Sequence, residues 1–146
     1  MRIHADKKGI RALGIAESFK KGEGRRAVLA GVVMRADLQI DGFSLTTITI
    51  GGLDGTDGVL DIFKRLERTD INLILLNGCV ISLFNLVDIF KVHERTKIPI
   101  ICVTYEESEG LEKYFEEFKD CEERMEIYLR LGERTKIKLH TGHEVL

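Results

Sequence analysis

Acidic and amide side chains follow several apolar segments of this chain. Glu17 comes directly after one apolar run, and Asn77 ends another. Asp54 and Asp57 lie in a glycine-rich segment between them. Hard divalent ions such as Mg²⁺ and Mn²⁺ prefer carboxylate, amide and water oxygens, and they can activate water in phosphodiester cleavage. We therefore nominate Glu17, Asp54 and Asp57 as metal ligands, and we place Asn77 with Glu17 and Asp54 in the catalytic set.

Each of these acids also has a purely structural interpretation. Asp54 and Asp57 stand where a helix begins, and negative side chains are stabilised there by the free N–H groups and the helix dipole. Glu17 can be the first solvated residue after a strand. The glycines from Gly51 to Gly58 suit a tight turn between strand and helix, since no Lys-Ser/Thr pair follows them as it does in a phosphate-binding loop.

Basic residues crowd the segment that follows Glu17. Phosphate contacts dominate the affinity of proteins for nucleic acid, so a basic flap beside a carboxylate cluster suits a nucleic-acid substrate. The alternative is a solvated hairpin loop. Two further residues are added as substrate contacts: Asn85, whose alternative role is to cap or orient a predicted helix, and Tyr105, which follows a predicted strand. The full substrate-binding set is Lys20, Lys21, Arg25, Arg26, Asn85 and Tyr105.

The spacing of apolar residues predicts the elements that must position these side chains. Six segments read as strands: Ile10–Ala16, Ala27–Met34, Phe43–Ile50, Asn72–Asn77, Ile98–Thr104 and Thr135–Leu139. Four segments have helical spacing: Val59–Leu66, Leu83–Val92, Leu111–Phe118 and Met125–Leu131. Short connections join the first three strands, which favours an antiparallel meander. Helices separate the later strands, which favours right-handed crossovers and parallel pairing.

This order predicts an α/β fold with a mixed sheet of five or six strands and flanking helices. The first, third, fourth and fifth strands then end at one edge of the sheet. Glu17, Asp54 and Asn77 collect at that edge, with Glu106 as a more distant candidate. Ligand sites of open α/β sheets usually lie at such carboxyl ends.

Composition favours one globular domain over residues 1–146, since 44% of the residues are hydrophobic. The net charge of −2 excludes a uniformly basic nucleic-acid-binding protein. No apolar run suits a signal peptide or a membrane span. The three cysteines form no C-x-x-C pair and favour reduced thiols in a cytoplasm. Many charges and few Asn or Gln residues favour a thermophilic source.

Four segments resemble the sequence blocks of an archaeal family, domain of unknown function ninety-nine. They are Gly9–Phe19, Gly31–Arg35, Leu76–Asp88 and Val103–Glu112, and they run through most of the chain. That family is similar to endonuclease V, a magnesium-dependent nuclease that acts on deaminated purines. The resemblance implies a ribonuclease-H-like fold, a divalent metal and a nucleic-acid substrate. It also implies that residues 1–146 lack a C-terminal extension found in the family.

The resemblance locates the family's catalytic positions in this chain. Endonuclease V has an aspartate at the end of its first strand, where this chain has Ala16 and then Glu17. It has an Asp-Gly pair after a later strand, where this chain has Asn77 and Gly78. The resemblance assigns the nuclease's catalytic glutamate to no residue here.

Three functional hypotheses follow from the sequence. The first is a metal-dependent nucleic-acid-processing enzyme. The second is a catalytically inactive module that binds nucleic acid through its basic loop. The third is a domain that binds a small molecule or a protein, including a homodimer formed through exposed strand edges.

Overall fold

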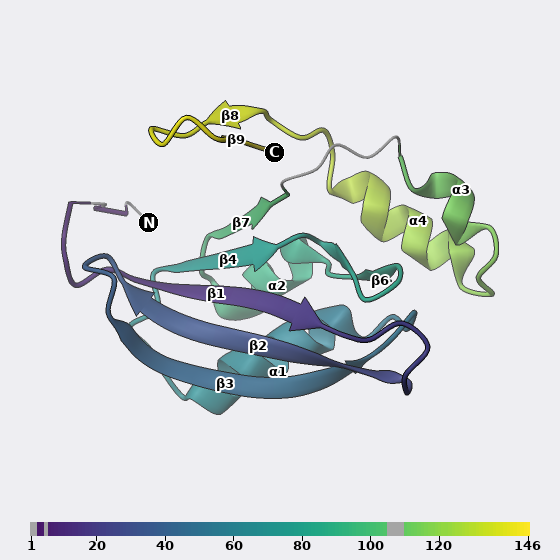
Figure 1. Ribbon diagram of the computed structural model, residues 1–146, viewed down its shortest axis with the longest axis horizontal. Helices are drawn as coiled ribbons and strands as arrows, with labels where there is room; N and C mark the ends of the chain where they lie inside the picture. Colours follow the sequence, from purple (N-terminus) through teal and green to yellow (C-terminus); the bar gives the residue numbers. More distant parts are fainter. Residues whose placement is uncertain (1–2, 5, 105–109) are drawn as a thin grey trace.

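The computed structural model describes residues 3–4, 6–104 and 110–146. Its centre is a five-stranded sheet in the order β3-β2-β1-β4-β7 (Figure 1). The strands are β1 (Arg11–Ser18), β2 (Arg26–Arg35), β3 (Ile40–Thr49), β4 (Leu73–Asn77) and β7 (Ile100–Val103). The first three form an antiparallel meander, and β4 and β7 run parallel to β1. This is the predicted ribonuclease-H-like arrangement.

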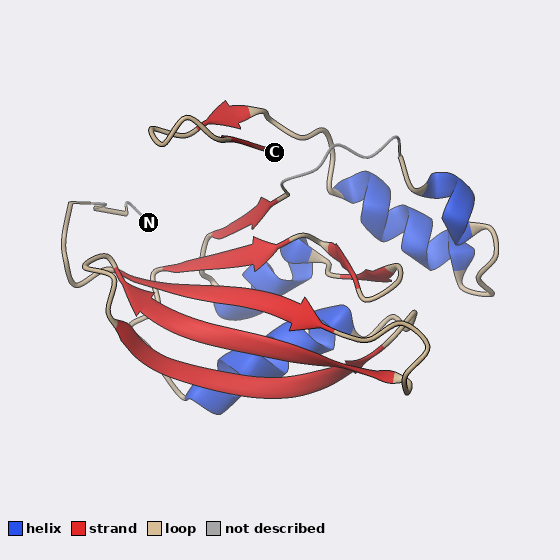
Figure 2. Ribbon diagram, viewed as in Figure 1, coloured by secondary structure: helices blue, strands red, loops and turns tan. Residues whose placement is uncertain are grey.

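Two helices, α1 (Gly55–Leu66) and α2 (Ile89–Thr96), cover one face of this sheet (Figure 2). Alternate residues of each strand point into the core between sheet and helices, as the two-residue period of a strand requires. Leu13 of β1 and Ile74 of β4 are fully buried there, together with Ile62 of α1 and Val92 of α2. The α2 helix begins where the Asp88 carboxylate accepts hydrogen bonds from the next free backbone N–H groups.

A short hairpin replaces the start of the helix that the sequence predicts from Leu83. Its strands are β5 (Val80–Ile81) and β6 (Asn85–Leu86). Between them Ser82, Leu83 and Phe84 have φ angles of 44°, 57° and 67°. Residues in this left-handed region cannot continue a right-handed helix, so the predicted helix is wrong before Ile89.

The C-terminal helices lie toward the edge at which β1 and β4 end, whereas the two last strands lie beyond β7 (Figure 1). The C-terminal part contains α3 (Glu112–Phe115), α4 (Cys121–Arg130), β8 (Ile137–Lys138) and β9 (Glu144–Val145). The predicted last strand therefore exists as the short β8, but it pairs with β9 in a separate two-stranded sheet. Thr104 and Leu146 exchange two backbone hydrogen bonds, which attach the chain end beside β7.

Cys79, after β4, is joined to Cys102 of β7 by a disulfide, with Cα atoms 6.3 Å apart. The expectation that the cysteines are all reduced is therefore wrong. The cause is topological: β4 and β7 are neighbouring parallel strands, so residues 23 positions apart in sequence come together. Cys121 is a free cysteine.

Gly31 of β2 tests how closely the sheet packs on α1. A Cβ atom there would lie 2.4 Å from Ile62 Cγ2 and 3.2 Å from Leu13 Cδ1. We expect Gly31→Ala to lower the free energy of unfolding by about 1–3 kcal/mol, because the rigid branched side chain of Ile62 must move. Urea unfolding measures the change. Gly9→Ala is the control, since nothing lies within 4 Å of a Cβ there; equal stability of the two variants would contradict this packing.

Candidate functional site

The sheet edge at which β1 and β4 end opens into a cleft of about 830 Å³. Glu17 and Asn77 both line it, as the sequence predicts for residues at these strand ends. Ser82 of the hairpin, Thr104 and Arg134 add polar groups, and apolar residues of β7 and α4 form much of the remaining wall. The cleft therefore combines an apolar wall with a few polar groups near the end of the sheet.

Glu17 is held by the hairpin turn. Its carboxylate accepts a hydrogen bond of 2.9 Å from the Ser82 hydroxyl, and a longer one of 3.4 Å from the Ser82 backbone N–H. Ser82 itself is only 2% exposed. Both carboxylate oxygens of Glu17 thus face a buried residue whose backbone is left-handed.

Asp54 belongs to a different cluster, behind the hairpin. Its carboxylate accepts hydrogen bonds from the Thr49 backbone N–H at 3.0 Å and the Thr49 hydroxyl at 2.9 Å. The Asn85 amide donates a third at 2.8 Å. Burial raises the pKa of Asp54, but the hydrogen bonds from Thr49 and Asn85 together lower this pKa below its ordinary value of 3.8. The side chain makes no capping bond to α1, although Asp54 precedes that helix.

Asn85 is fully buried and joins three segments. Its amide nitrogen donates to the Thr49 carbonyl at 2.9 Å as well as to Asp54. Its amide oxygen accepts from the backbone N–H of Gly55, the first residue of α1, at 2.8 Å. Both amide hydrogens are therefore used inside the protein, and the residue nominated as a substrate contact connects the hairpin to β3 and α1.

Arg124 of α4 is a site residue that the sequence interpretation missed. It is 2% exposed and donates to the carbonyls of Phe84, at 2.6 Å, and Gly51, at 2.9 Å. Its guanidinium lies 3.9 Å from the centroid of the Phe118 ring and forms an ion pair with Asp120. The only signal in the sequence was the spacing of Asp120 and Arg124, four residues apart, which is typical of an ion pair on an exposed helix surface.

The nominated metal ligands do not assemble within the described residues. No group of three His, Cys, Asp or Glu side chains is placed there to hold an ion. Asp57 is exposed in the first turn of α1, and the oxygens of Glu17 and Asp54 are engaged separately. Of the nominated residues, Glu17 and Asn77 line the same cleft, and metal binding there stays a prediction. Tyr105 and Glu106 lie outside the described residues.

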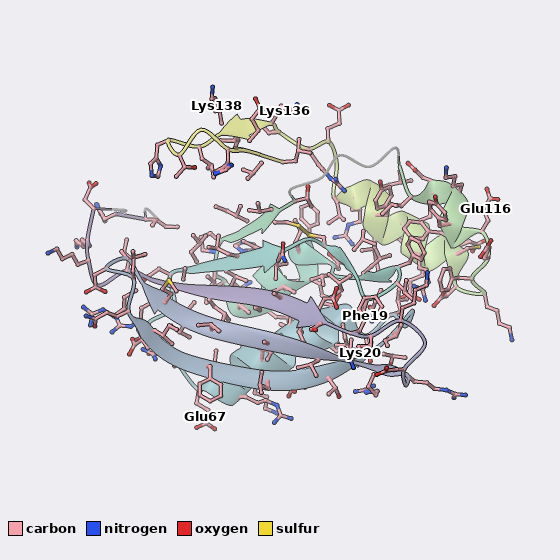
Figure 3. The ribbon with its side chains drawn as sticks, in the orientation of Figure 1. Phe19, Lys20, Glu67, Glu116, Lys136 and Lys138 are labelled. Atoms are coloured by element: carbon pink, nitrogen blue, oxygen red, sulfur yellow. A yellow bond between two sulfur atoms is a disulfide. The ribbon has the colours of Figure 1, made fainter. Side chains whose placement is uncertain are left out.

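The basic loop between β1 and β2 begins at the same edge, and Figure 3 shows Lys20 just beyond the end of β1. Lys20 forms an exposed ion pair with Glu23 at 3.3 Å. Arg26 is directed to the sheet, where it donates to the Thr47 hydroxyl at 2.7 Å. Lys21 and Arg25 are exposed on the loop. Of the four nominated cations, Lys20 and Arg26 therefore form ion pairs, whereas Lys21 and Arg25 form none with the described residues.

Residues 8–146 match the family described as endonuclease dU. The chain belongs to this family. A UPF0215 protein from Pyrobaculum calidifontis is 38% identical over 135 residues, which cover 91% of this chain and 74% of that protein. A second, from Methanopyrus kandleri, is 35% identical over 141 residues and covers 94% and 72% of the two chains. Archaeal relatives were expected from the sequence blocks and are found, whereas the family named there, domain of unknown function ninety-nine, stays a prediction.

Solved structures with a similar fold confirm the ribonuclease-H-like arrangement expected for this chain. A protein of unknown function from Archaeoglobus fulgidus has a TM-score of 0.78 and 28% identity, covering 93% of this chain and 76% of that one. Human endonuclease V has a TM-score of 0.57 and 15% identity, covering 98% and 70%. Endonuclease V from Ciona intestinalis, in complex with DNA containing an inosine, has a TM-score of 0.52 and 14% identity, covering 90% and 60%. At these identities the two nucleases share the fold with this chain.

The hydrogen bonds around Asp54 predict its titration. Because the folded-state pKa is lowered below 3.8, ionised Asp54 stabilises the fold above that value, and this contribution is lost as the pH falls through the folded-state pKa. We expect Thr49→Val to raise the pKa of Asp54, because one donor to the carboxylate is removed. Carboxyl ¹³C NMR titration measures it. Thr46→Val is the control, since the Thr46 hydroxyl donates to Asp61 instead; an equal shift of the Asp54 pKa in both variants would contradict the assigned cause.

Proposed function

We propose that this chain is a nucleic-acid-binding protein built on a nuclease fold, with its binding surface at the carboxyl edge of the sheet. The observation that carries the proposal is the distribution of charge at that edge. The oxygens of Glu17 and Asp54 are taken up by internal hydrogen bonds, whereas Lys21 and Arg25 extend from the neighbouring loop into solvent.

The basic loop suits a phosphate backbone better than a small anion. Gly22 and Gly24 have φ angles of 84° and 73°, which only glycine adopts without strain. Lys21 and Arg25 therefore lie on an exposed loop and do not line the cleft. Exposed lysine and arginine side chains release condensed counterions when they meet phosphates, which gives affinity without a basic overall charge. The protein's net charge of −2 is compatible with such a local patch.

The family supports the same partner. Its name is that of an endonuclease, and the Ciona intestinalis endonuclease V with a similar fold was crystallised with DNA containing an inosine. The proposal includes a cytoplasmic location, because archaeal nucleic acid lies there. The Cys79–Cys102 disulfide is compatible with that location in a hyperthermophile, since intracellular proteins of such archaea are rich in disulfides. Within the described residues, no helix is long and apolar enough to cross a membrane.

A second candidate function is divalent-metal-dependent cleavage of deaminated nucleic acid. It is favoured by one observation: Glu17 and Asn77, from neighbouring strands, line the same cleft. In that function Glu17 would hold Mg²⁺ or Mn²⁺ and Asn77 would be a neutral ligand. Two observations count against this function. The Glu17 carboxylate already accepts a hydrogen bond from the Ser82 hydroxyl, and Asn77 lacks the negative charge that a hard-metal ligand normally has.

Salt dependence tests the binding surface. We expect Lys21→Gln/Arg25→Gln to weaken binding to a duplex oligonucleotide, and to reduce the slope of log Kd against log salt by about 2, because two phosphate contacts are lost. Fluorescence anisotropy at several salt concentrations measures both. The control is Lys64→Gln/Arg95→Gln, which removes two exposed charges from the last turns of α1 and α2. An unchanged slope in the loop variant would count against the proposed surface.

Cleavage assays separate the two candidate functions. With millimolar Mn²⁺ and a duplex containing one deoxyuridine or inosine, we expect binding without strand scission, because the described residues bring no three His, Cys, Asp or Glu side chains together. Denaturing gel electrophoresis detects the products, and calorimetry measures metal binding without nucleic acid. A scission product that disappears in Glu17→Gln, together with metal-binding heat that also disappears, would establish the second candidate in place of the first.

A further inference from the structure

The central sheet has a second face that no described helix covers. The helices α1 and α2 lie on one side of the sheet, and the broad face of β1, β2 and β3 on the other side is open in the ribbon view (Figure 2). Large apolar side chains are exposed on this open face. Phe43 is 72% exposed, Leu45 is 54% exposed and Ile101 is 48% exposed. An apolar surface of this kind normally marks an interface.

The strand register shows that the apolar side chains form continuous rows. Residues paired across neighbouring strands lie on the same face of a sheet. One row crosses all five strands and contains no charged residue: Phe43, Val32, Gly14, Leu75 and Ile101. A parallel row is Leu45, Ala30 and Ala16, and a third is Ile40, Met34, Ala12 and Leu73.

The amount of exposed surface is large for a single folded chain. The accessible area is 9780 Å², whereas a compact monomer of 16.6 kDa exposes about 7,600 Å². The excess over the whole chain is about 2,000 Å². A specific interface buries roughly 800 Å² on each partner, which is less than this excess.

The shape of the open face is complementary to itself. Phe43 and Leu45 form a ridge along the edge strand β3, while the neighbouring interior strand β1 presents only Ala12, Gly14 and Ala16 between larger side chains. The closest atom to a Cβ built at Gly14 is the Val32 carbonyl oxygen at 3.9 Å, so the space above this trough is open. A two-fold axis that lies in the plane of the interface, parallel to the strands and over β2, would place the ridge of each copy over the trough of the other.

We propose that the chain forms a two-fold symmetric dimer in which the open faces of the two sheets pack against each other. Near a two-fold axis each residue meets its own copy, so a charged centre would repel itself. The three rows carry no charge, and this obstacle is absent. The three rows contain no residue of the basic loop, although Ile101 of the first row also lines the cleft. The dimer is independent of the phosphate contacts proposed for Lys21 and Arg25.

Solution mass tests the dimer. Sedimentation equilibrium at micromolar concentration should give twice the chain mass of 16.6 kDa. Phe43→Asp/Leu45→Asp should sediment as a monomer with an unchanged far-UV circular dichroism spectrum, because both side chains are exposed in the single chain. The matched control is Leu129→Asp, which places a charge at a 62% exposed position on α4 and should stay dimeric.

A second variant tests the ridge-and-trough geometry. Gly14→Leu fills the trough from the open side and should raise the dimer dissociation constant at least tenfold without unfolding the chain. If the wild-type chain is still a monomer at 100-fold higher concentration, the proposal is overturned. The open face would then be available to another segment, such as the part of the relatives' chains that the matched region does not cover. A dimer that survives both the Phe43→Asp/Leu45→Asp and the Gly14→Leu changes would also overturn it, since its interface must then lie elsewhere.

Discussion

The arrangement of side chains at the carboxyl edge of the sheet depends on the hairpin turn, where Ser82, Leu83 and Phe84 all have left-handed backbone. Each such residue costs roughly 1–2 kcal/mol relative to ordinary backbone. The surrounding groups offset this cost: Glu17 accepts from Ser82, the Gly51 N–H donates to the Ser82 carbonyl at 2.7 Å, and Arg124 donates to the Phe84 carbonyl. The Phe84 ring also stacks on Tyr114, with centroids 5.2 Å apart. Strand β1, the loop after β3 and the C-terminal helices thus converge on one turn.

This constraint explains why the acids at the edge do not form one cluster. Glu17 and Asp54 both lie against the segment that contains the turn, but Glu17 contacts it at Ser82 and Asp54 contacts it at Asn85. The hairpin therefore lies between them and uses their hydrogen-bonding capacity. Where the family resemblance places catalytic aspartates, this chain has Ala16 with Glu17 and, on β4, Asn77. In this chain the Glu17 and Asp54 carboxylates accept internal hydrogen bonds, and Lys21 and Arg25 of the adjoining loop are exposed.

Much of the sheet was predictable from sequence because the two-residue and 3.6-residue periods of its apolar positions are distinct. The meander, α1, β4 and β7 follow from these periods and from short connections. The hairpin could not be predicted in this way, because Ile81, Leu86 and Val87 are buried at intervals that a helix can equally produce. Likewise Arg124 looked like a surface residue, since nothing local indicates that its partners Gly51 and Phe84 are 73 and 40 positions away. Strand ends were predictable, whereas the direction of the side chains at those ends depended on long-range contacts.

The Cys79–Cys102 bond closes a covalent ring around the hairpin, α2 and the start of β7. A closed loop of this length removes conformational entropy from the denatured chain that corresponds to about 3 kcal/mol. The ring contains Ser82, Leu83 and Phe84, so three successive left-handed residues lie in the segment whose freedom in the unfolded chain the bond restricts. In the unfolded chain the bond still joins the segment after β4 to β7, the edge strand with which β4 pairs in the folded sheet.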